Sequence, residues 1–473
     1  MTTDNARPPT GKPTRFTGRQ RLILLVLLGA GFMLSVDFSI LNVALPKVGD
    51  GVGLSRAALP WIASAYALPA AGFTLLCGRL GDLFGRRRLF LAGTVLLTAA
   101  SLLGGLATNP AMLLTGRALQ GLSTALTIPA SLSLLTTTFR EGATRDRVLG
   151  FNGALLSGGF TIGALVGGTL VSLLSWRSAF LINVPVAVAI LALTPFLISE
   201  SRVPGRVRLD VPGAVTVTGG LLAAVYAVIE KDIFAGAAGA LLLMAFWLIE
   251  LRSPAALAPV RILRRPTVRW GNYAGLVVFS METSMIFMMT LYLQNVLGLG
   301  PLATGLVFGV PGLAAVLAGP VAGRLIGRRG YRTVLPLGLA VQTLATIPLI
   351  FLGSGRIGLA VLVPALLISF FGHVTSIVAY TVIGTSGLPN GEQGLATGLT
   401  TMTQNVAITI GIPIMSAIAA TRVSELNGIH LALTVNVLFT LASAALVWIG
   451  LRPRPDHSAA TSTPPAAAEV QGY

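Results

Sequence analysis

Long apolar runs are the feature that most restricts what this chain can fold into. A helix that crosses the hydrocarbon core of a bilayer needs about 20 consecutive, mainly apolar residues. The runs here reach that length, and they do not alternate polar with apolar residues as the strands of a transmembrane β-barrel do. Only 10% of the residues are charged, against roughly 25% in soluble domains. The sequence therefore predicts an all-α integral membrane protein with fourteen transmembrane helices. The runs lie near residues 21–46, 57–77, 89–108, 111–137, 148–172, 178–198, 212–229, 233–251, 270–296, 301–323, 333–353, 357–381, 394–419 and 431–451.

The positions of the basic residues predict the orientation of these helices, because lysines and arginines close to span ends stay in the cytoplasm. With a cytoplasmic N-terminus, 26 of the 33 basic residues fall in cytoplasmic segments, and an even number of spans also places the C-terminus in the cytoplasm. The net charge of +17 could indicate a nucleic-acid partner. Because the basic residues occupy short loops, where they set topology and contact anionic lipids, no nucleic-acid partner is expected.

The two ends of the chain and its cysteine content add smaller constraints. The first twenty residues are polar and basic, and no small-residue cleavage site follows a short apolar core, so we expect the first span to be retained. The residues after Arg454 have the composition of a disordered tail. Cys77 is the only cysteine, which excludes intramolecular disulfides and cysteine-based metal clusters. The excess of arginine over lysine, with much alanine and glycine, suggests a GC-rich bacterial genome.

Two similar glycine-rich loops indicate an internal repeat, which is common in membrane chains. The loop after the second span reads G-R-L-G-D-L-F-G-R-R-R (Gly78–Arg88), and the loop after the tenth reads G-R-L-I-G-R-R-G-Y-R (Gly323–Arg332). The offset in residue number between these loops is the same as the offset between Asp37 and Glu282, so the two acids occupy equivalent positions of the repeat. The simplest division of the chain is therefore six spans, two extra spans and six more.

Asp37 and Glu282 are the acids that fall well inside predicted spans. A charged side chain at such a position costs about 2.5–3.5 kcal/mol on insertion scales, so it usually faces a water-filled cavity or a partner. A carboxyl group in a low-dielectric environment can also take up and release protons near neutral pH. We therefore expect both acids to act in proton coupling or substrate binding. The alternative is that each is held by a structural hydrogen bond or ion pair.

Arg117 is the one basic residue well within a predicted span, and Gln120 lies one helical turn away on the same face. A permanently charged guanidinium can hold a nearby carboxylate ionised, or release it when the geometry changes. We therefore assign Arg117 to the site with the two acids, and Gln120 to its cavity. The alternative is an arginine that snorkels to the membrane surface.

Four further residues are candidates for a substrate cavity. Met285 and Met289 share a helix stripe with Glu282, and methionine suits adaptable apolar surfaces, although such a stripe is also typical of a plain core. His373 could join a proton path or be a hydrogen-bonded structural histidine. Asn42 belongs to the same span as the first acid.

Small residues recur in the fifth span, which reads G-G-F-T-I-G-A-L-V-G-G. Gly159, Gly163 and Gly167 share one helix face and are joined by Gly168. Small residues at this spacing let two helix backbones approach closely and permit bending. We expect them to form a helix-packing hinge, with packing alone as the alternative.

The loop after the second span contains an acid among glycines and arginines. Glycines permit a tight turn. Asp82 can accept backbone N–H bonds at a helix start or pair with a neighbouring arginine. A cluster that only sets topology explains the arginines but leaves this acid unexplained.

These stretches resemble motifs of the major facilitator superfamily, and within it the fourteen-span branch of the drug:proton antiporters. The loop Gly78–Arg88 is similar to the signature loop between spans 2 and 3 of the superfamily. The segment Asp37–Pro46 (D-F-S-I-L-N-V-A-L-P), the R-A-L-Q-G that begins at Arg117 and the glycine-rich fifth span resemble antiporter motifs. The segment Arg206–Gly213 (R-V-R-L-D-V-P-G) matches the basic stretch and L-D-x-P-G that precede span 7 in this branch.

The resemblance implies two pseudo-symmetric six-helix bundles around a central cavity, with two additional helices between them. It also implies a monomer in a bacterial cytoplasmic membrane that works by alternating access powered by inward proton flow. The expected segments are a cytoplasmic basic tail (1–20), an N-terminal bundle (21–199), a linker with two additional helices (200–269), a C-terminal bundle (270–452) and a disordered cytoplasmic tail (453–473).

Individual roles also follow from the resemblance. Asp37 would take part in proton coupling or cation binding, Arg117 in proton relay, and the fifth span in the contact between halves. One departure is that Ala164 stands where the family usually has a proline, so this helix should bend less. Spans 10 and 13 also lack the extra acids that some multidrug members carry, which disfavours cargo of high positive charge. The expected cytoplasmic gate consists of Gly78, Asp82, Gly85, Arg86, Arg87 and Arg88.

The sequence thus predicts proton-coupled export of small amphiphilic or cationic compounds, as in a multidrug or antibiotic exporter. The expected partners are the cargo, protons and membrane lipids, and the proton gradient replaces any cofactor. A symporter, a dedicated exporter of one natural product and a lipid or precursor flippase are the alternatives. A flippase would need paired basic residues in its cavity, which Arg117 alone does not supply. Exposed segments carry no paired histidine ligands, nucleophile elbow or phosphate loop, so no enzyme activity is expected.

Overall fold

The computed structural model describes residues 16–139, 143–201, 210–253, 256, 262, 264–385 and 393–452, apart from a few side chains within helices. This part of the chain consists of helices and connecting loops, with no strand. The α-helices are α1 (Gly18–Val52), α2 (Pro60–Phe84), α3 (Arg86–Gly105), α4 (Pro110–Thr138), α5 (Ala143–Leu173), α6 (Ser178–Leu181), α7 (Asn183–Leu197), α8 (Val211–Glu230), α9 (Ile233–Arg252), α11 (Pro266–Leu291), α12 (Pro301–Arg329), α13 (Tyr331–Thr346), α14 (Leu359–Thr385), α15 (Gln393–Ala419) and α16 (Glu425–Gly450). Short 3-10 or π segments cover Arg56–Ala58, Tyr292–Val296, Ile347–Phe351 and Arg356–Gly358.

Within the described residues, twelve helical stretches are long and apolar enough to cross a membrane. Each apolar run of the sequence coincides with a helix or with two consecutive helices, such as α6 and α7. The helices α2 and α5 are not among the twelve. The first is 25 residues long, and the second contains a shorter apolar helix, Gly158–Leu173. The prediction of an all-helical membrane protein is confirmed.

The helix starts follow from local sequence. Thr17 and Gln20 form a capping box at the beginning of α1. At the beginning of α8 the Oδ1 atom of Asp210 accepts a hydrogen bond from the N–H of Gly213, and Pro212 lies in the first turn. The described part of the L-D-x-P-G stretch therefore starts a helix. Residues 202–209 lie outside the described residues.

The two glycine-rich loops have the same backbone geometry at equivalent residues. Gly85 separates α2 from α3 with φ +109°, and Gly330 separates α12 from α13 with φ +76°. Both values lie in the region that glycine adopts readily and other residues rarely do. The repeated glycine is thus used for the same sharp reversal in both copies.

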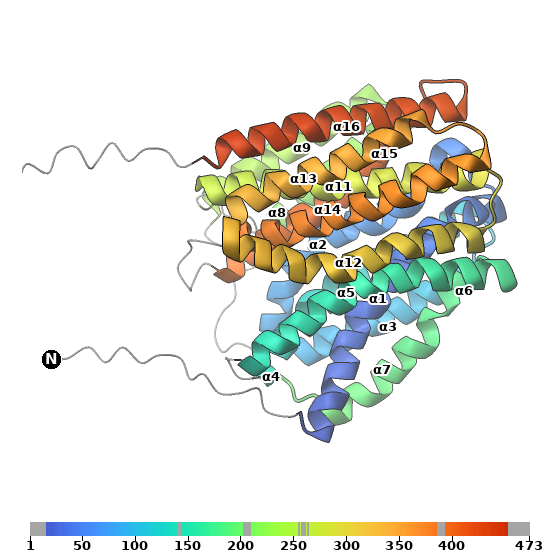
Figure 1. Ribbon diagram of the computed structural model, residues 1–473. Helices are drawn as coiled ribbons and strands as arrows, with labels where there is room; N and C mark the ends of the chain where they lie inside the picture. Colours follow the sequence, from blue (N-terminus) through green and yellow to red (C-terminus); the bar gives the residue numbers. More distant parts are fainter. Residues whose placement is uncertain are drawn as a thin grey trace, which may run out of the picture.

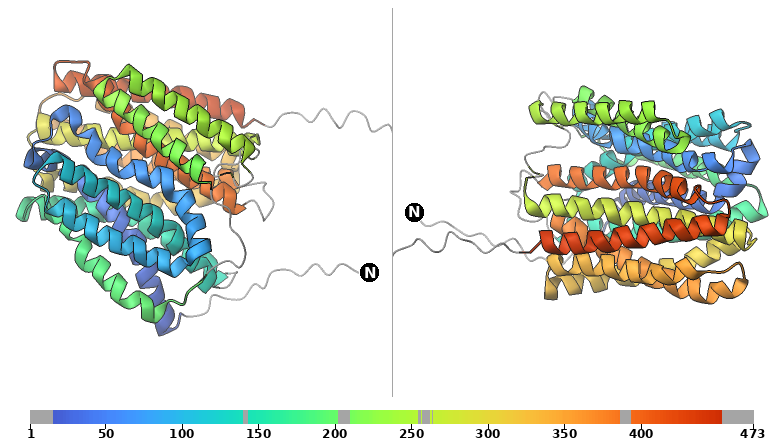
Figure 2. Two further views of the ribbon diagram at one scale, coloured as in Figure 1. Left: turned by 180° about the vertical axis from the view of Figure 1, so that it is seen from behind. Right: turned by 90° about the horizontal axis from the view of Figure 1, so that it is seen from above.

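Helices α1–α7 and α11–α16 form two groups that meet along two helix pairs. The pairs are α5 with α12 and α2 with α15, so the second helix of each group meets the fifth helix of the other. In Figure 1 the pair α5 and α12 lies between the blue-to-green N-terminal group and the yellow-to-red C-terminal group. Helices α8 and α9 pack on each other, and α8 contacts both α2 and α15. Figure 2 shows this light-green pair at the side of the bundle.

The predicted glycine stripe of α5 packs inside the N-terminal group. A Cβ atom added to Gly163 would lie 2.7 Å from the carbonyl oxygen of Val36 in α1, and one added to Gly167 would lie 2.8 Å from the Cα of Ile40. Gly159 faces the same helix at Phe32 and Ser35. The stripe therefore permits close approach of α1 and α5, as its spacing predicts.

The contact between the two groups uses another face of α5. Glycines on α12 meet that face: Cβ atoms added to Gly305, Gly309 and Gly312 would lie within 2.5 Å of Ala164, Leu165 and Thr161, respectively. Gly168 joins this face, not the stripe, because an added Cβ would lie 2.6 Å from the carbonyl oxygen of Pro301. The fifth span does contact the other half, but of the four predicted glycines only Gly168 takes part.

Polar contacts also join the two groups at the end of the bundle that holds the α1–α2 and α15–α16 connections. Arg56 forms an exposed ion pair of 3.0 Å with Glu425. Asn295 donates to the same carboxylate at 2.6 Å, and Gln294 donates to the carbonyl of Val43 at 2.7 Å. The sequence predicts this end to be the outer one.

Candidate functional site

The structure brings Asp37, Arg117 and Gln120 together in one buried network. The Nη1 atom of Arg117 lies 3.1 Å from Oδ2 of Asp37, and Nε2 of Gln120 donates to Oδ1 of Asp37 at 3.1 Å. A third donor, Nδ2 of Asn183 at the start of α7, lies 2.5 Å from the same Oδ1. Asp37 has no exposed surface and Arg117 is 1% exposed. The carboxylate thus belongs to a buried ion pair fixed by two neutral donors.

Arg117 is positioned by three further contacts. Its Nε donates to the carbonyl of Ile62 in α2 at 3.1 Å, and its Nη1 donates to Oε1 of Gln120 at 2.8 Å. The guanidinium carbon also lies 4.5 Å from the ring centre of Tyr66, a cation–π arrangement. Arg117 therefore does not snorkel to the surface. It connects α4 with α1 and α2.

Four participants in this network were not identified from the sequence. Asn183 and Ser101 extend the hydrogen-bond network, because Gln120 and Asn183 both donate to Oγ of Ser101. Tyr66 and the carbonyl of Ile62 hold the arginine. The available signal was an amide at the start of an otherwise apolar sixth span. Serine and tyrosine in spans are too common to stand out.

The two charges of this buried ion pair depend on each other. Its attraction only balances the desolvation of both charges if the geometry is good and the remaining donors and acceptors are satisfied. A proton added to Asp37 removes the negative charge and leaves the Arg117 guanidinium buried without its counter-ion. The contact between α1 and α4 therefore depends on the charges of both side chains.

Glu282 lies in very different surroundings from its sequence counterpart. It is 2% exposed, and its Oε2 accepts one hydrogen bond, from Nε2 of Gln342 in α13, at 2.8 Å. No basic side chain pairs with it among the described residues. The repeat spacing places Leu362, a fully buried residue of α14, at the position of Arg117. The two acids occupy equivalent positions, but only the first is in an ion pair.

The loop between α2 and α3 is fixed by a carboxylate from another helix end. Glu200, which follows α7, accepts hydrogen bonds from the backbone N–H groups of Arg87 at 3.0 Å and Arg88 at 3.2 Å. The arginine side chains lie 4.0 and 3.8 Å from the same carboxylate. A carboxylate at a helix N-terminus is favoured by the helix dipole. Glu200 therefore caps α3, a role that the sequence pattern suggested for Asp82.

Of the other residues predicted for this loop, some form the reversal and the start of α3, and others lie elsewhere or are not described. Gly85 makes the reversal, and an added Cβ would lie 2.7 Å from the Glu200 carboxylate. Arg86 begins α3, and its N–H donates to the carbonyl of Ser201 at 2.8 Å. Gly78 lies within α2. The side chain of Asp82 lies outside the described residues.

Sequence comparison agrees with this architecture. Residues 27–412 match the Major Facilitator Superfamily. The chain belongs to this superfamily. Its members are membrane transporters, so the chain is a transporter. The earlier resemblance is confirmed at this level.

Several named proteins align with most of the chain. The cephamycin export protein CmcT of Amycolatopsis lactamdurans is 34% identical over 99% of both chains. The puromycin resistance protein pur8 of Streptomyces alboniger is 32% identical over 94% of both chains. The multidrug resistance protein Stp of Mycobacterium tuberculosis is 31% identical over 87% of this chain and 78% of its own.

The remaining cavity candidates of this superfamily member lie in packed surroundings. Met285 and Met289 are 2% and 0% exposed and belong to the large apolar core. The ring of His373 packs edge-on against Phe279, 5.8 Å away. The amide of Asn42 donates to the carbonyl of the preceding helical turn. Neither of the two described pockets is lined by these residues, so their role in a cavity remains a prediction.

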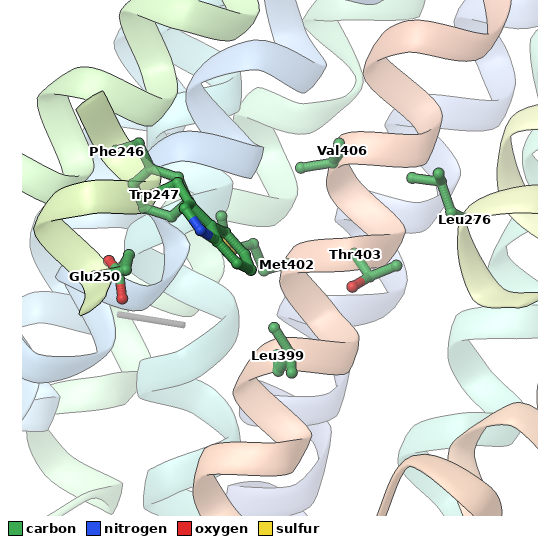
Figure 3. A pocket seen from close by; sticks show the side chains of 8 residues that line it. All are labelled: Phe246, Trp247, Glu250, Leu276, Leu399, Met402, Thr403 and Val406. Carbon is green, nitrogen blue, oxygen red and sulfur yellow. The ribbon is translucent and has the colours of Figure 1, made fainter. Parts of the chain in front are cut away.

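One described pocket, of about 200 Å³, lies between α9 and α15. Figure 3 shows Trp247 reaching from α9 towards Met402 on α15, with Glu250 at the same side as the tryptophan. The pocket is almost entirely apolar, and Glu250 is buried. Its lining residues are Phe246, Trp247, Glu250, Leu276, Leu399, Met402, Thr403 and Val406.

Proposed function

We propose that the protein exports small amphiphilic or cationic compounds, including antibiotics, in exchange for protons. The named relatives support the cargo class, because they are an antibiotic export protein, an antibiotic resistance protein and a multidrug resistance protein. Each proton that moves inward down 100 mV releases about 2.3 kcal/mol. For one proton exchanged for one neutral cargo molecule, that energy is enough to drive a useful cargo gradient without a cofactor.

The observation that carries the proton coupling is the buried pair of Asp37 and Arg117. It joins α1 to α4 in the N-terminal group, and its carboxylate already has three donors. A proton on Asp37 would release Arg117, which would weaken the contact between these helices. Re-forming the pair after proton release would return the protein to the conformation described here.

The reciprocal contacts between the two helix groups support alternating access. Two matched helix pairs, α5 with α12 and α2 with α15, connect the groups. Glycines on α12 let this helix approach α5 closely, and a contact made of small residues suits a surface that must open and close. We propose that the outer contacts around Glu425 open when cargo is released.

The placement in the membrane is also a proposal. We infer that α2 and α5 cross the bilayer with the twelve other helical stretches, which gives fourteen spans with both termini in the cytoplasm. The length of α2 supports this, at 25 residues. We also propose two six-helix bundles (21–199 and 270–452), a linker with two additional helices (200–269) and a monomeric state. The membrane would be the bacterial cytoplasmic membrane.

A direct test reconstitutes the purified protein in liposomes that contain a trapped pH dye. Puromycin serves as a cationic cargo under an imposed pH gradient, and a proton ionophore serves as the control that removes the gradient. The proposal predicts a cargo-dependent proton flux together with cargo movement. Cargo movement that is the same with and without the gradient would contradict proton coupling.

A dedicated exporter of one natural product is the second candidate. It is favoured by the end-to-end similarity to the cephamycin export protein, which covers 99% of both chains. A panel that contains puromycin, a cephamycin and unrelated lipophilic cations separates the two candidates. Transport of a single panel member would favour the dedicated exporter, and transport of several would favour the multidrug exporter.

A further inference from the structure

The buried acid of the C-terminal group has a hydrogen-bonding arrangement that is incomplete without a proton. Glu282 and Gln342 are 2% and 4% exposed, and they lie on two helices of the same group, α11 and α13. Nε2 of Gln342 donates to Oε2 of Glu282 at 2.8 Å. The other oxygen of each side chain, Oε1 in both cases, is buried and has no hydrogen-bond partner within the described structure.

Two unsatisfied oxygens on a bonded acid–amide pair have a simple chemical explanation. An ionised carboxylate is only an acceptor, and so is the amide oxygen, so neither can satisfy the other. A protonated carboxyl group gains one O–H donor. One proton on Oε1 of Glu282 would therefore give this pair the donor that it lacks, and the same proton would occupy the unpartnered carboxyl oxygen.

The surrounding helices supply no alternative positive charge. Basic residues of α11 and α13 occur only in their first turns, at Arg269 and Arg332, and α14, α15 and α16 contain no lysine or arginine. On α1, which also contacts α11, Asp37 is paired with Arg117. An ionised Glu282 would thus be a buried charge without a counter-ion, which is strongly unfavourable.

The other titratable groups on the helices around Glu282 have partners or lie at helix ends. Tyr380 donates to the carbonyl of Thr400, and His430 is bonded to the carbonyl of Leu352. His373 is the exception: it lies inside the group, its Nδ1 is buried without a hydrogen-bond partner within the described structure, and its ring packs on Phe279, one helical turn before Glu282. The further groups are Tyr273, bonded to Ser443, Tyr292, bonded to Gly353, and the helix-end residues Tyr331, Glu425, Lys47 and Asp50.

We propose that Glu282 and Gln342 form a second proton-binding site, and that in this conformation Glu282 is neutral and donates its proton to Gln342. A proton fits the site better than a cationic cargo molecule does, because Glu282 is nearly fully buried and lines neither described pocket. The equivalent acids of the two halves then differ in protonation. Asp37 is ionised and paired with Arg117, and Glu282 is protonated.

The proposal has a consequence for the transport cycle, and this part rests on the proposed function. If Glu282 releases its proton to the cytoplasm and is reloaded from outside, each cycle moves one proton more than Asp37 alone would carry. Loss of the second site should therefore lower the number of protons exchanged per cargo molecule by one and leave coupling through Asp37 in place.

Infrared spectroscopy of the purified protein in detergent tests the charge state without cargo or gradient. The wild type is compared at neutral pH with Glu282→Gln, Gln342→Leu and Asp37→Asn, after each variant has passed a check of helicity and elution volume. We expect a C=O stretching band of a protonated carboxyl group that disappears in Glu282→Gln. The band should move to higher frequency in Gln342→Leu, which removes its hydrogen-bond partner, and remain unchanged in Asp37→Asn.

The opposite pattern would overturn the proposal. No such band in the wild type, or a band that persists in Glu282→Gln, means that Glu282 is ionised. If Glu282→Gln does not fold, the band and its shift between wild type and Gln342→Leu decide the question. The liposome assay then compares proton-to-cargo ratios of wild type and Glu282→Gln. Absence of any coupled flux in the wild type would refute the proposed function but leave the infrared assignment standing.

Discussion

The buried pair of Asp37 and Arg117 is the strongest residue-scale feature of the molecule. Both side chains are almost completely removed from solvent, and every oxygen of the carboxylate has a donor. Truncating one partner of such a pair usually costs about 3–5 kcal/mol, because the other charge is left buried alone. The pair should therefore behave as a unit in mutational tests.

We expect Arg117→Met to lower the free energy of unfolding by about 3–5 kcal/mol. Adding Asp37→Asn should recover part of the loss, since no charge then remains buried. Thermal unfolding in detergent measures both, and Arg56→Met is the control because its ion pair is exposed and worth about 0–1 kcal/mol. A double variant less stable than Arg117→Met alone would contradict this interpretation.

The residue-scale predictions succeeded where a residue type was out of place in its span. Asp37 and Arg117 are charges in apolar runs, and the structure brings them together. Asn183 and Glu200 were missed because their importance depends on distant partners. Asn183 lies 146 residues from Asp37 in the chain, and Glu200 caps a helix that begins more than a hundred residues earlier. Sequence spacing within one helix cannot reveal such contacts.

At the scale of single elements, helix α5 packs against α1 with one face and against α12 with another. Gly163→Val would place side-chain atoms against the backbone of α1. We expect a loss of about 1–3 kcal/mol from overpacking, measured as a lower unfolding temperature. Gly158→Val is the matched control on the same helix, because nothing lies within 4 Å of the added Cβ. Equal effects of the two substitutions would show that close approach of α1 is not what requires Gly163.

The missing proline of α5 gives a second element-scale prediction. In a helix the N–H of residue 164 bonds the carbonyl of Phe160, and Ser39 also donates to that carbonyl at 2.5 Å. Ala164→Pro removes the first bond but not the second. We therefore expect it to cost less than the roughly 3 kcal/mol usual for proline inside a helix.

The test of this prediction is a double-mutant cycle of unfolding temperatures. Ser39→Ala should be more harmful in the Ala164→Pro background than alone, because the Phe160 carbonyl then loses both donors. Simple additivity of the two effects would mean that Ser39 does not compensate for the proline.

Several helices extend beyond the apolar runs from which their spans were predicted. The tenth predicted span ends at residue 323, whereas α12 continues to Arg329, and the first ends at 46, whereas α1 continues to Val52. An apolar run ends at the first charges, but backbone hydrogen bonding continues through polar residues outside the hydrocarbon core. Pro46 does not end α1 either.

At the scale of the whole molecule, the repeat predicted two related halves but not how they meet. The loop glycines Gly85 and Gly330 adopt the same kind of backbone conformation, which agrees with the repeat. The resemblance placed the fifth span at the contact between the halves, but its partner α12 and the pairing of α2 with α15 came from the structure. Such contacts depend on which faces of long apolar helices match, and those faces are nearly uniform in composition.

The outer contact between halves offers a whole-molecule prediction. Replacing Arg56 and Glu425 by cysteines, with Cys77→Ser to remove the native thiol, allows a short bifunctional thiol reagent to link the two halves. Because these side chains are in contact here at 3.0 Å, we expect cross-linking to stop cargo transport in liposomes. Either single-cysteine variant treated with the same reagent should remain active. Full transport by the cross-linked protein would mean that this end need not open.

The central claim is that Asp37 couples proton movement to cargo movement. The most direct measurement compares Asp37→Asn with Asp50→Asn, an exposed acid on the same helix, in two liposome assays. One follows cargo accumulation driven by a pH gradient, and the other follows exchange of labelled for unlabelled cargo at equal pH on both sides. We predict that Asp37→Asn lowers accumulation and keeps exchange, and that Asp50→Asn keeps both at the wild-type level. Accumulation by Asp37→Asn equal to that of Asp50→Asn would contradict the account.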